Sequence, residues 1–168
     1  MTELQKWLQL IRDGNMVAFE ALYDEMKRPL FTIILRIMQN RQLAEDVLQE
    51  LFLKLYSSPP EPSVNPRAYL CQMARNLTID SARCQKQHSD LEQENAFHSP
   101  LDDLSQILDI EDAIQALPQR ELQIFTLRHK GELKFQEIAT IMGMPLGTVF
   151  WAYQKAIEQL KITLGGAL

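Results

Sequence analysis

The sequence predicts an all-α fold of two small helical domains joined by a flexible acidic linker. Through most of the 168 residues, apolar side chains recur at three- and four-residue steps, which is the pattern of amphipathic helices. That pattern fails in a polar middle segment, where residues 91–108 carry four acids and no base. The length suits one domain of ordinary size or two small ones. We therefore expect a first domain at residues 1–88, a linker at 89–106 and a second domain at 107–168.

The first two helices are expected on either side of Gly14, which can supply a left-handed closing residue. Apolar side chains at helical spacing mark the first helix near residues 4–11, and Asn15 can cap the second. Pro29 should kink or restart the second helix, because proline lacks a backbone N–H and clashes with the preceding turn. The nearly all-apolar run that follows, residues 30–38, is expected to be a central core helix.

The helix expected at residues 42–56 has two distinct faces. Its apolar stripe, which can face a core, consists of Ala44, Val47, Leu48, Leu51, Phe52 and Leu55. Outside the stripe lie Glu45, Asp46, Gln49 and Glu50. These residues are either the acid that a helix macrodipole favours near its N-terminus or a docking face for a basic partner. The local sequence alone leaves both interpretations open.

A proline-rich loop and a basic helix complete the first domain. Four prolines in SSPPEPSVNP exclude a helix there and indicate a stiff, exposed loop. Asn65 is a plausible N-cap for a helix that starts at Pro66 and ends near Lys86. One flank of this helix carries Arg67, Tyr69, Arg75, Asn76, Arg83 and Lys86. Cations can hold phosphates and a ring can stack on an unpaired base, so the flank is either a nucleic-acid surface or a solvated helix face.

The second domain should contain a helix-turn-helix. A helix from near Ile107 to Pro118 and another at residues 119–129 are expected to precede it. A short helix at 135–142, a tight turn at Gly143 and a longer helix at 145–161 then follow the spacing of this motif. The alternative is a helical hairpin with no role in DNA binding.

Composition limits the remaining classes of function. The net charge of −5 comes mostly from the middle segment, which argues against indiscriminate nucleic-acid binding. No run approaches the roughly 20 apolar residues that span a bilayer, and no signal-peptide pattern is present, so we expect a cytoplasmic protein without membrane insertion. Cys71 and Cys84 should lie roughly 20 Å apart on one helix, too far for a disulfide. No metal-ligand spacing or catalytic constellation is present, so we expect no metal, no cofactor and no enzyme activity.

Several segments together resemble one family of proteins. They are AFEALYDEM at 18–26, LAEDVLQELFLKLY at 43–56, NPRAYLCQMARNLTIDSAR at 65–83, and LPQRELQIFTLR with FQEIATIMGMPLGTV from 117 to 149. With these segments in this order, the chain resembles a bacterial RNA polymerase sigma factor of the extracytoplasmic-function (ECF) group. These small sigma-70 relatives keep only domains two and four. The resemblance implies a specificity subunit that directs core RNA polymerase to promoters, and it leaves an anti-sigma factor open as a further partner.

The resemblance also implies roles for individual residues. Contacts to core polymerase fall on Asp46, Gln49 and Glu50, which would give the acidic face its basic partner. Recognition and melting of the minus-ten element fall on Arg67, Tyr69, Arg75, Asn76, Arg83 and Lys86. Recognition of the minus-thirty-five element falls on Gln136, Thr148, Trp151, Gln154 and Lys155. The acidic linker would thread through the polymerase near its active-site and RNA-exit channels.

The recognition helix departs from the family pattern. Where relatives usually have a Lys-Ser-Arg-like triplet, this chain has Phe150, Trp151 and Ala152, so phosphate contacts are missing. An outward Trp151 would touch thymine methyl groups, pack against a protein, or have no role. Two rival functions therefore remain: a polymerase-binding adaptor with degenerate promoter recognition, and a helix-turn-helix regulator that is not a sigma subunit.

Overall fold

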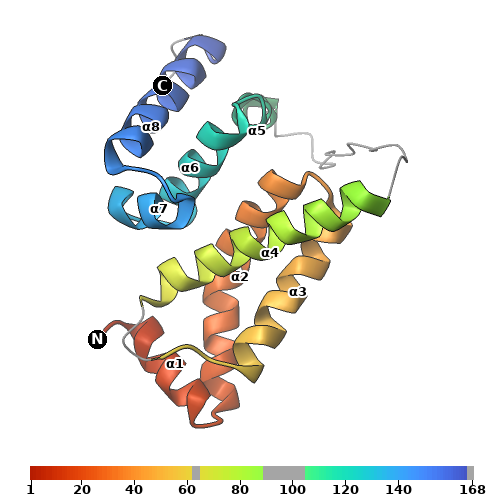
Figure 1. Ribbon diagram of the computed structural model, residues 1–168, viewed down its shortest axis with the longest axis vertical. Coiled ribbons are helices and arrows are strands. Elements are labelled where there is room, and N and C mark those ends of the chain that lie inside the picture. The colour runs from red at the N-terminus through yellow and green to blue at the C-terminus, as the bar shows by residue number, and fades with distance from the viewer. Residues whose placement is uncertain (62–64, 89–104, 166–168) are drawn as a thin grey trace. The chain divides into compact units, whose positions relative to one another are not determined.

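The structure is a computed structural model that describes residues 1–61, 65–88 and 105–165 (Figure 1). Within these ranges it contains eight helices and no strand, which confirms the all-α fold class. The chain divides into two compact units, residues 1–95 and 96–168. Residues 89–104, most of the predicted linker, lie outside the described ranges. No helix in the described part of the chain is both long and apolar enough to cross a membrane.

The N-terminal unit is built around its second helix. It consists of α1 (Glu3–Arg12), α2 (Met16–Met38), α3 (Arg41–Ser57) and α4 (Pro66–His88). Helix α2 packs against each of the other three, and α4 also packs on α3, as Figure 1 shows. Fully buried side chains such as Leu22, Leu30, Ile34, Leu51 and Leu70 fill the space between these helices. This core holds the outer faces of α3 and α4 in place.

Capping residues determine where α2 and α3 begin. The Asn15 side chain accepts a hydrogen bond from the Ala18 N–H at 3.1 Å, as predicted, and Gly14 has a φ of +85°. Asn40 caps α3 in the same way, accepting from the Leu43 N–H at 3.0 Å. Each cap satisfies a backbone donor that has no partner within the helix.

Pro29 does not restart α2, so the expectation of a restart there is wrong. The helix continues from Met16 to Met38 with Pro29 inside it. The turns after the proline bury Leu30, Ile33 and Ile34 almost completely. Burying an aliphatic side chain contributes about 1.5–3 kcal/mol, so these three together offset the roughly 3 kcal/mol that a proline costs inside a helix.

The C-terminal unit consists of α5 (Ser105–Gln115), α6 (Gln119–His129), α7 (Phe135–Met142) and α8 (Leu146–Thr163). Helix α8 packs against the other three. Part of the core of the C-terminal unit is a cluster of side chains from α5, α6, α8 and the α5–α6 connection: Ala113, Ile114, Leu117, Leu122, Ala156 and Leu160.

The helix-turn-helix prediction is confirmed by the path from α7 to α8. Gly143 closes α7 in the left-handed region with a φ of +64°, where glycine has no steric penalty. The next residue, Met144, donates its N–H to the Ala139 carbonyl at 3.0 Å, which completes the tight turn. Val149, on the first turn of α8, is fully buried.

Two aromatic residues lie near the surface of the C-terminal unit. Phe125 and Tyr153 are only partly buried, the Tyr153 ring stacks with those of Phe125 and His129, and the Phe125 ring lies tilted against that of His129. The Tyr153 hydroxyl lies 3.0 Å from His129 Nε2. A phenol that must keep a polar partner stays at the edge of a core, and the small Ala152 is buried beside it instead.

Candidate functional site

The first candidate surface is the outward face of α3. Asp46, Gln49 and Glu50 are exposed, and their three- and four-residue spacing places them on one side of the helix. Glu50 pairs with Lys54 of the same helix at 3.1 Å. Among the described residues Asp46 has no ion pair. Sequence reasoning therefore placed all three residues correctly on the surface, although one of the two carboxylates is partly neutralised.

An exposed leucine lies on the same face of α3 and was missed by sequence reasoning. The side chain of Leu53 is 66% exposed. It follows Asp46 by seven residues and Glu50 by three, so it shares their side of the helix. The sequence did contain a signal for its exposure, because Leu53 lies outside the apolar stripe of the helix. The face thus combines carboxylates with an apolar side chain, a mixture that suits a protein partner.

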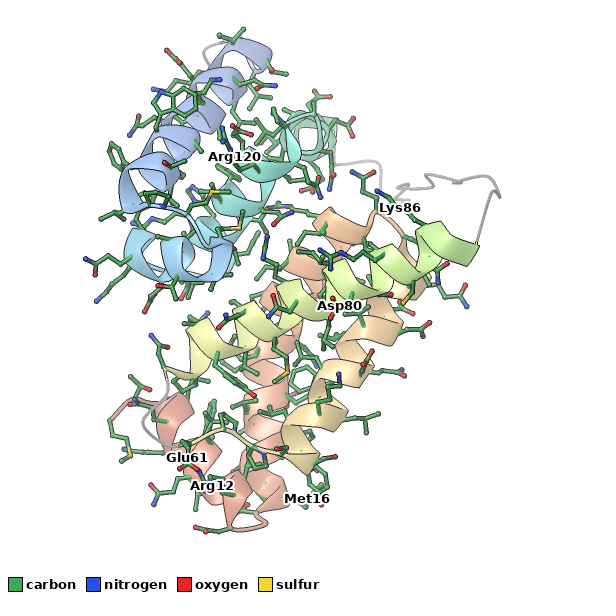
Figure 2. All side chains as sticks on the ribbon, in the orientation of Figure 1. Arg12, Met16, Glu61, Asp80, Lys86 and Arg120 are labelled. Atoms are coloured by element: carbon green, nitrogen blue, oxygen red, sulfur yellow. The ribbon has the colours of Figure 1, made fainter. Side chains whose placement is uncertain are left out.

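The second candidate surface is the basic flank of α4, and the structure divides it into two groups. Asn76, Arg83 and Lys86 are exposed, and Figure 2 shows Lys86 near the end of the helix. Tyr69, Arg67 and Arg75 are only partly exposed. The exposed group is therefore the part of the flank that is open to a ligand without rearrangement.

Two arginines of this flank, Arg67 and Arg75, lie partly buried against the N-terminal unit. Arg67 Nη2 lies 3.9 Å from Glu25 Oε1 on α2, and the arginine side chain is 21% exposed. Partial burial lowers the pKa of the Arg75 guanidinium from its ordinary value by desolvation. An arginine remains charged at neutral pH despite such a shift, so both side chains keep their cations at the edge of the unit.

An arginine from α1 holds the loop that leads towards α4. Arg12 Nη1 lies 2.9 Å from Glu61 Oε2 and donates a hydrogen bond to the Pro60 carbonyl at 3.3 Å (Figure 2). Beyond residues 62–64, the Asn65 side chain accepts hydrogen bonds from the N–H groups of Arg67 at 3.1 Å and Ala68 at 3.4 Å. The predicted capping role of Asn65 is thereby confirmed, whereas sequence reasoning missed the role of Arg12.

The third candidate surface lies on the helix-turn-helix. Gln136, Trp151, Gln154 and Lys155 are exposed, and Thr148 is partly buried. Trp151 points outward as predicted, with 54% of its side chain exposed. Lys155 Nζ lies 4.5 Å from the centroid of its ring, and Arg120 Cζ of α6 lies 5.8 Å from it. Cations at these distances are attracted to the indole ring, so two positive charges surround the exposed tryptophan.

Beside these residues an open hollow lies between the N-terminal ends of α7 and α8. Its volume is about 570 Å³, and its lining residues are Lys134, Phe135, Gln136, Leu146, Gly147 and Phe150. The Phe150 ring packs edge-on against the Phe135 ring, with centroids 5.6 Å apart. Sequence reasoning singled out Phe150 but missed Phe135 and Leu146 as surface residues, because both were assigned to helices without regard to the face they present.

The described residues contain no group of three or more His, Cys, Asp or Glu side chains that could hold a metal ion. Cys71 is buried, Cys84 is exposed, and neither forms a disulfide. The three surfaces are therefore built from hydrogen-bonding, charged and apolar side chains, which suit binding to macromolecules.

Comparisons with known proteins identify both units. The family model for sigma-70 region 2 matches residues 22–88, and that for sigma-70 region 4 matches residues 107–160. The ECF RNA polymerase sigma factor SigW of Bacillus subtilis is 28% identical, over 94% of this chain and 95% of the relative. The ECF sigma factor SigL of Mycobacterium tuberculosis is 30% identical, over 86% of this chain and 87% of the relative.

Solved structures show the same fold. CnrH, in complex with the cytosolic domain of CnrY, matches with a TM-score of 0.74 and 16% identity, over 99% of this chain and 100% of that one. The sigma factor RpoE of Bartonella quintana, in complex with the anti-sigma factor NepR, matches with a TM-score of 0.71 and 18% identity, over 89% and 98%. The paired region matches and the SigL relationship place the chain in the ECF group of RNA polymerase sigma factors.

Proposed function

We propose that this sigma factor binds core RNA polymerase through α3, carries it to a small set of promoters and helps to open the DNA there. The polymerase performs the chemistry, so the chain itself is not an enzyme, needs no cofactor and works in the cytoplasm. The observation that carries this proposal is the order of the two family regions, with an exposed acidic face on the first and a helix-turn-helix in the second. In this proposal residues 1–88 form the polymerase-docking and minus-ten domain, residues 89–106 the linker and residues 107–168 the minus-thirty-five domain.

Core polymerase is the proposed partner of Asp46, Gln49 and Glu50. The three side chains share one exposed face, so they can meet a basic surface together. Leu53 extends that face, and an exposed leucine at the centre of a docking surface would be desolvated on binding. Charge would then guide the encounter, and the leucine would slow dissociation.

The minus-ten element is the proposed ligand of α4. Arg83, Lys86 and Asn76 are open to the DNA backbone, and Tyr69 is available at the edge of the unit. Arg67 and Arg75 are the partly buried members of this set, so they would have to exchange their present surroundings for phosphate contacts. The minus-thirty-five element is the proposed ligand of Gln136, Thr148, Trp151, Gln154 and Lys155.

An anti-sigma factor is a further proposed partner. One of the matched structures contains CnrH with the cytosolic domain of CnrY, and the other contains the sigma factor RpoE with the anti-sigma factor NepR. A protein of that class would compete with core polymerase if it covered α3.

The test is run-off transcription of fragmented genomic DNA from the source organism, using core polymerase with and without the protein. New start sites that share paired upstream elements are expected. If none appear although the protein captures core polymerase, the adaptor becomes the better account, since Phe150 and Trp151 replace expected phosphate contacts. If the protein binds duplex DNA but fails to capture core polymerase, it is a helix-turn-helix regulator instead.

A further inference from the structure

The hollow between α7 and α8 presents an unusual surface for a recognition helix. Phe150 and Leu146, on the first two turns of α8, are 49% and 44% exposed. Together with Phe135 they make up half of the residues that line the hollow. Trp151 adds a further exposed ring next to Phe150. The end of the helix that a helix-turn-helix inserts into the major groove is therefore largely apolar.

The part of α8 beside this apolar surface carries no negative charge. Residues 146–157 include one lysine, Lys155, and no acidic residue. Lys134 lines the hollow at the start of α7, and Arg120 lies over Trp151 while its Nη2 pairs with Glu121 Oε1 at 2.9 Å. Glu137, the acid of α7, accepts a hydrogen bond from the Lys134 N–H at 2.8 Å and so caps its own helix. An apolar centre with a basic edge is complementary to a surface that has apolar groups between phosphates.

In the major groove thymine is the base whose edge carries such a group. Its C5-methyl is apolar, whereas the other bases present nitrogen and oxygen donors or acceptors there. A phenylalanine or leucine pressed against those polar atoms would remove their water without replacing the hydrogen bond, which costs free energy. Against a methyl group the same side chain buries apolar surface, which is favourable.

We propose that Phe150 and Leu146 read thymine methyl groups in the minus-thirty-five element, with Trp151 packing beside them. The inference rests on the proposed function and names the bases that its second DNA surface prefers. Lys155 and Lys134 contact the flanking phosphates. A protein surface is the competing occupant of the hollow, and the cations around it and its place at the start of the recognition helix favour DNA.

The experiment uses the full-length protein, core polymerase and a promoter found by run-off transcription. Thymines of the minus-thirty-five element are replaced by deoxyuridine, one strand at a time, which removes the methyl group and keeps every hydrogen-bonding atom. Replacing one contacted thymine should lower open-complex formation about fourfold, because one methyl contact is lost. The same number of replacements in the spacer between the two promoter elements serves as the control and should have no effect.

A variant of the protein links the effect to the hollow. Phe150→Lys should make initiation insensitive to deoxyuridine at the thymines that Phe150 contacts, while those that Leu146 contacts stay sensitive. It should also steepen the dependence of initiation on salt, because a phosphate contact replaces an apolar one. Ile162→Lys, at the other end of α8 where the side chain is 79% exposed, adds the same charge and should keep the sensitivity. Leu146→Ser is the second variant, for use if loss of the Phe135 contact unfolds the Phe150 variant in circular dichroism.

The outcomes separate this inference from the proposed function. Sensitivity that is lost in the Phe150 variant and kept in the Ile162 variant supports thymine reading. If the protein directs initiation but deoxyuridine in the element has no effect, thymine reading is overturned, the sigma function stands, and the hollow is assigned to a protein. Absence of initiation at every promoter would overturn both.

Discussion

At the scale of single residues, the acidic face of α3 contains two carboxylates that differ in ion pairing. Glu50 is paired with Lys54, whereas Asp46 has no ion pair within the described parts of the chain. An exposed pair four residues apart on a helix contributes only about 0.3–0.5 kcal/mol. Glu50 can therefore exchange its lysine for a partner's cation at little cost, and Asp46 needs no exchange at all.

Reversing both charges should abolish capture of core polymerase. For Asp46→Lys with Glu50→Lys we expect at least about a tenfold loss of affinity in a pull-down or titration, since like charges would now face each other. The fold should be unaffected because both side chains are exposed. The matched control is Glu3→Lys with Asp13→Lys, at the two ends of α1, which makes the same change in net charge. Unchanged capture by the α3 variant would remove the docking assignment.

Leu53 allows the apolar part of the same face to be tested separately. Leu53→Ser should weaken core binding about fivefold to tenfold, as expected for an apolar anchor in an interface. It should change the free energy of unfolding by less than about 0.5 kcal/mol, because surface substitutions rarely do more. Val17→Ser is the control, since Val17 is 75% exposed on α2. Equal affinities for the two variants would show that Leu53 lies outside the interface.

At the scale of elements, α1 has a role that lies outside the sigma-70 region 2 match. That match begins at residue 22, whereas Arg12 belongs to α1. Its guanidinium holds Pro60 and Glu61 at the start of the connection to α4. Proline restricts the backbone at residue 60, so this contact fixes where the chain leaves α3. Helix α1 thereby helps to present the surface that we assign to the minus-ten element.

Removing this anchor should impair DNA opening more than polymerase binding. Arg12→Ala should lower initiation from duplex promoters about twofold to fivefold, in line with the energy of a partly exposed ion pair. Initiation from a template that is already melted at the minus-ten element should not change, because no opening is required. Arg12→Glu combined with Glu61→Arg should restore activity on duplex DNA. An equal loss on both templates would indicate a merely structural role for Arg12.

The bounds of single helices could be predicted from the sequence, whereas contacts between helices could not. Periodicity and punctuation by Pro118 and Gly143 were sufficient to give the bounds of α6 and α7, because these signals are local. The contacts of Arg12 with Glu61 and of Arg67 with Glu25 join different elements, and no local pattern encodes them. Exposed site residues were therefore found from their helix faces, whereas the partial burial of Arg67 and Arg75 could not be foreseen.

At the scale of the whole molecule, binding to promoters should depend on both units together. Residues 106–168 alone should bind duplex DNA weakly and with a shallow dependence on salt. Each phosphate contact that the recognition helix lacks removes about 0.9 from the slope of log affinity against log salt. Titration of this fragment at two salt concentrations, with its helical content checked by circular dichroism, measures the slope. Tight binding that falls steeply with salt would contradict the prediction.

The central position of α2 has a consequence for local unfolding of the N-terminal unit. Because α2 packs against α1, α3 and α4, none of these helices can detach without uncovering part of the same core. Amide hydrogens around Leu30, Ile33 and Ile34 should then exchange with solvent only when the whole unit opens. The surface that we assign to polymerase on α3 and the surface that we assign to DNA on α4 therefore belong to one cooperative unit, so the position of one ligand would fix the position of the other.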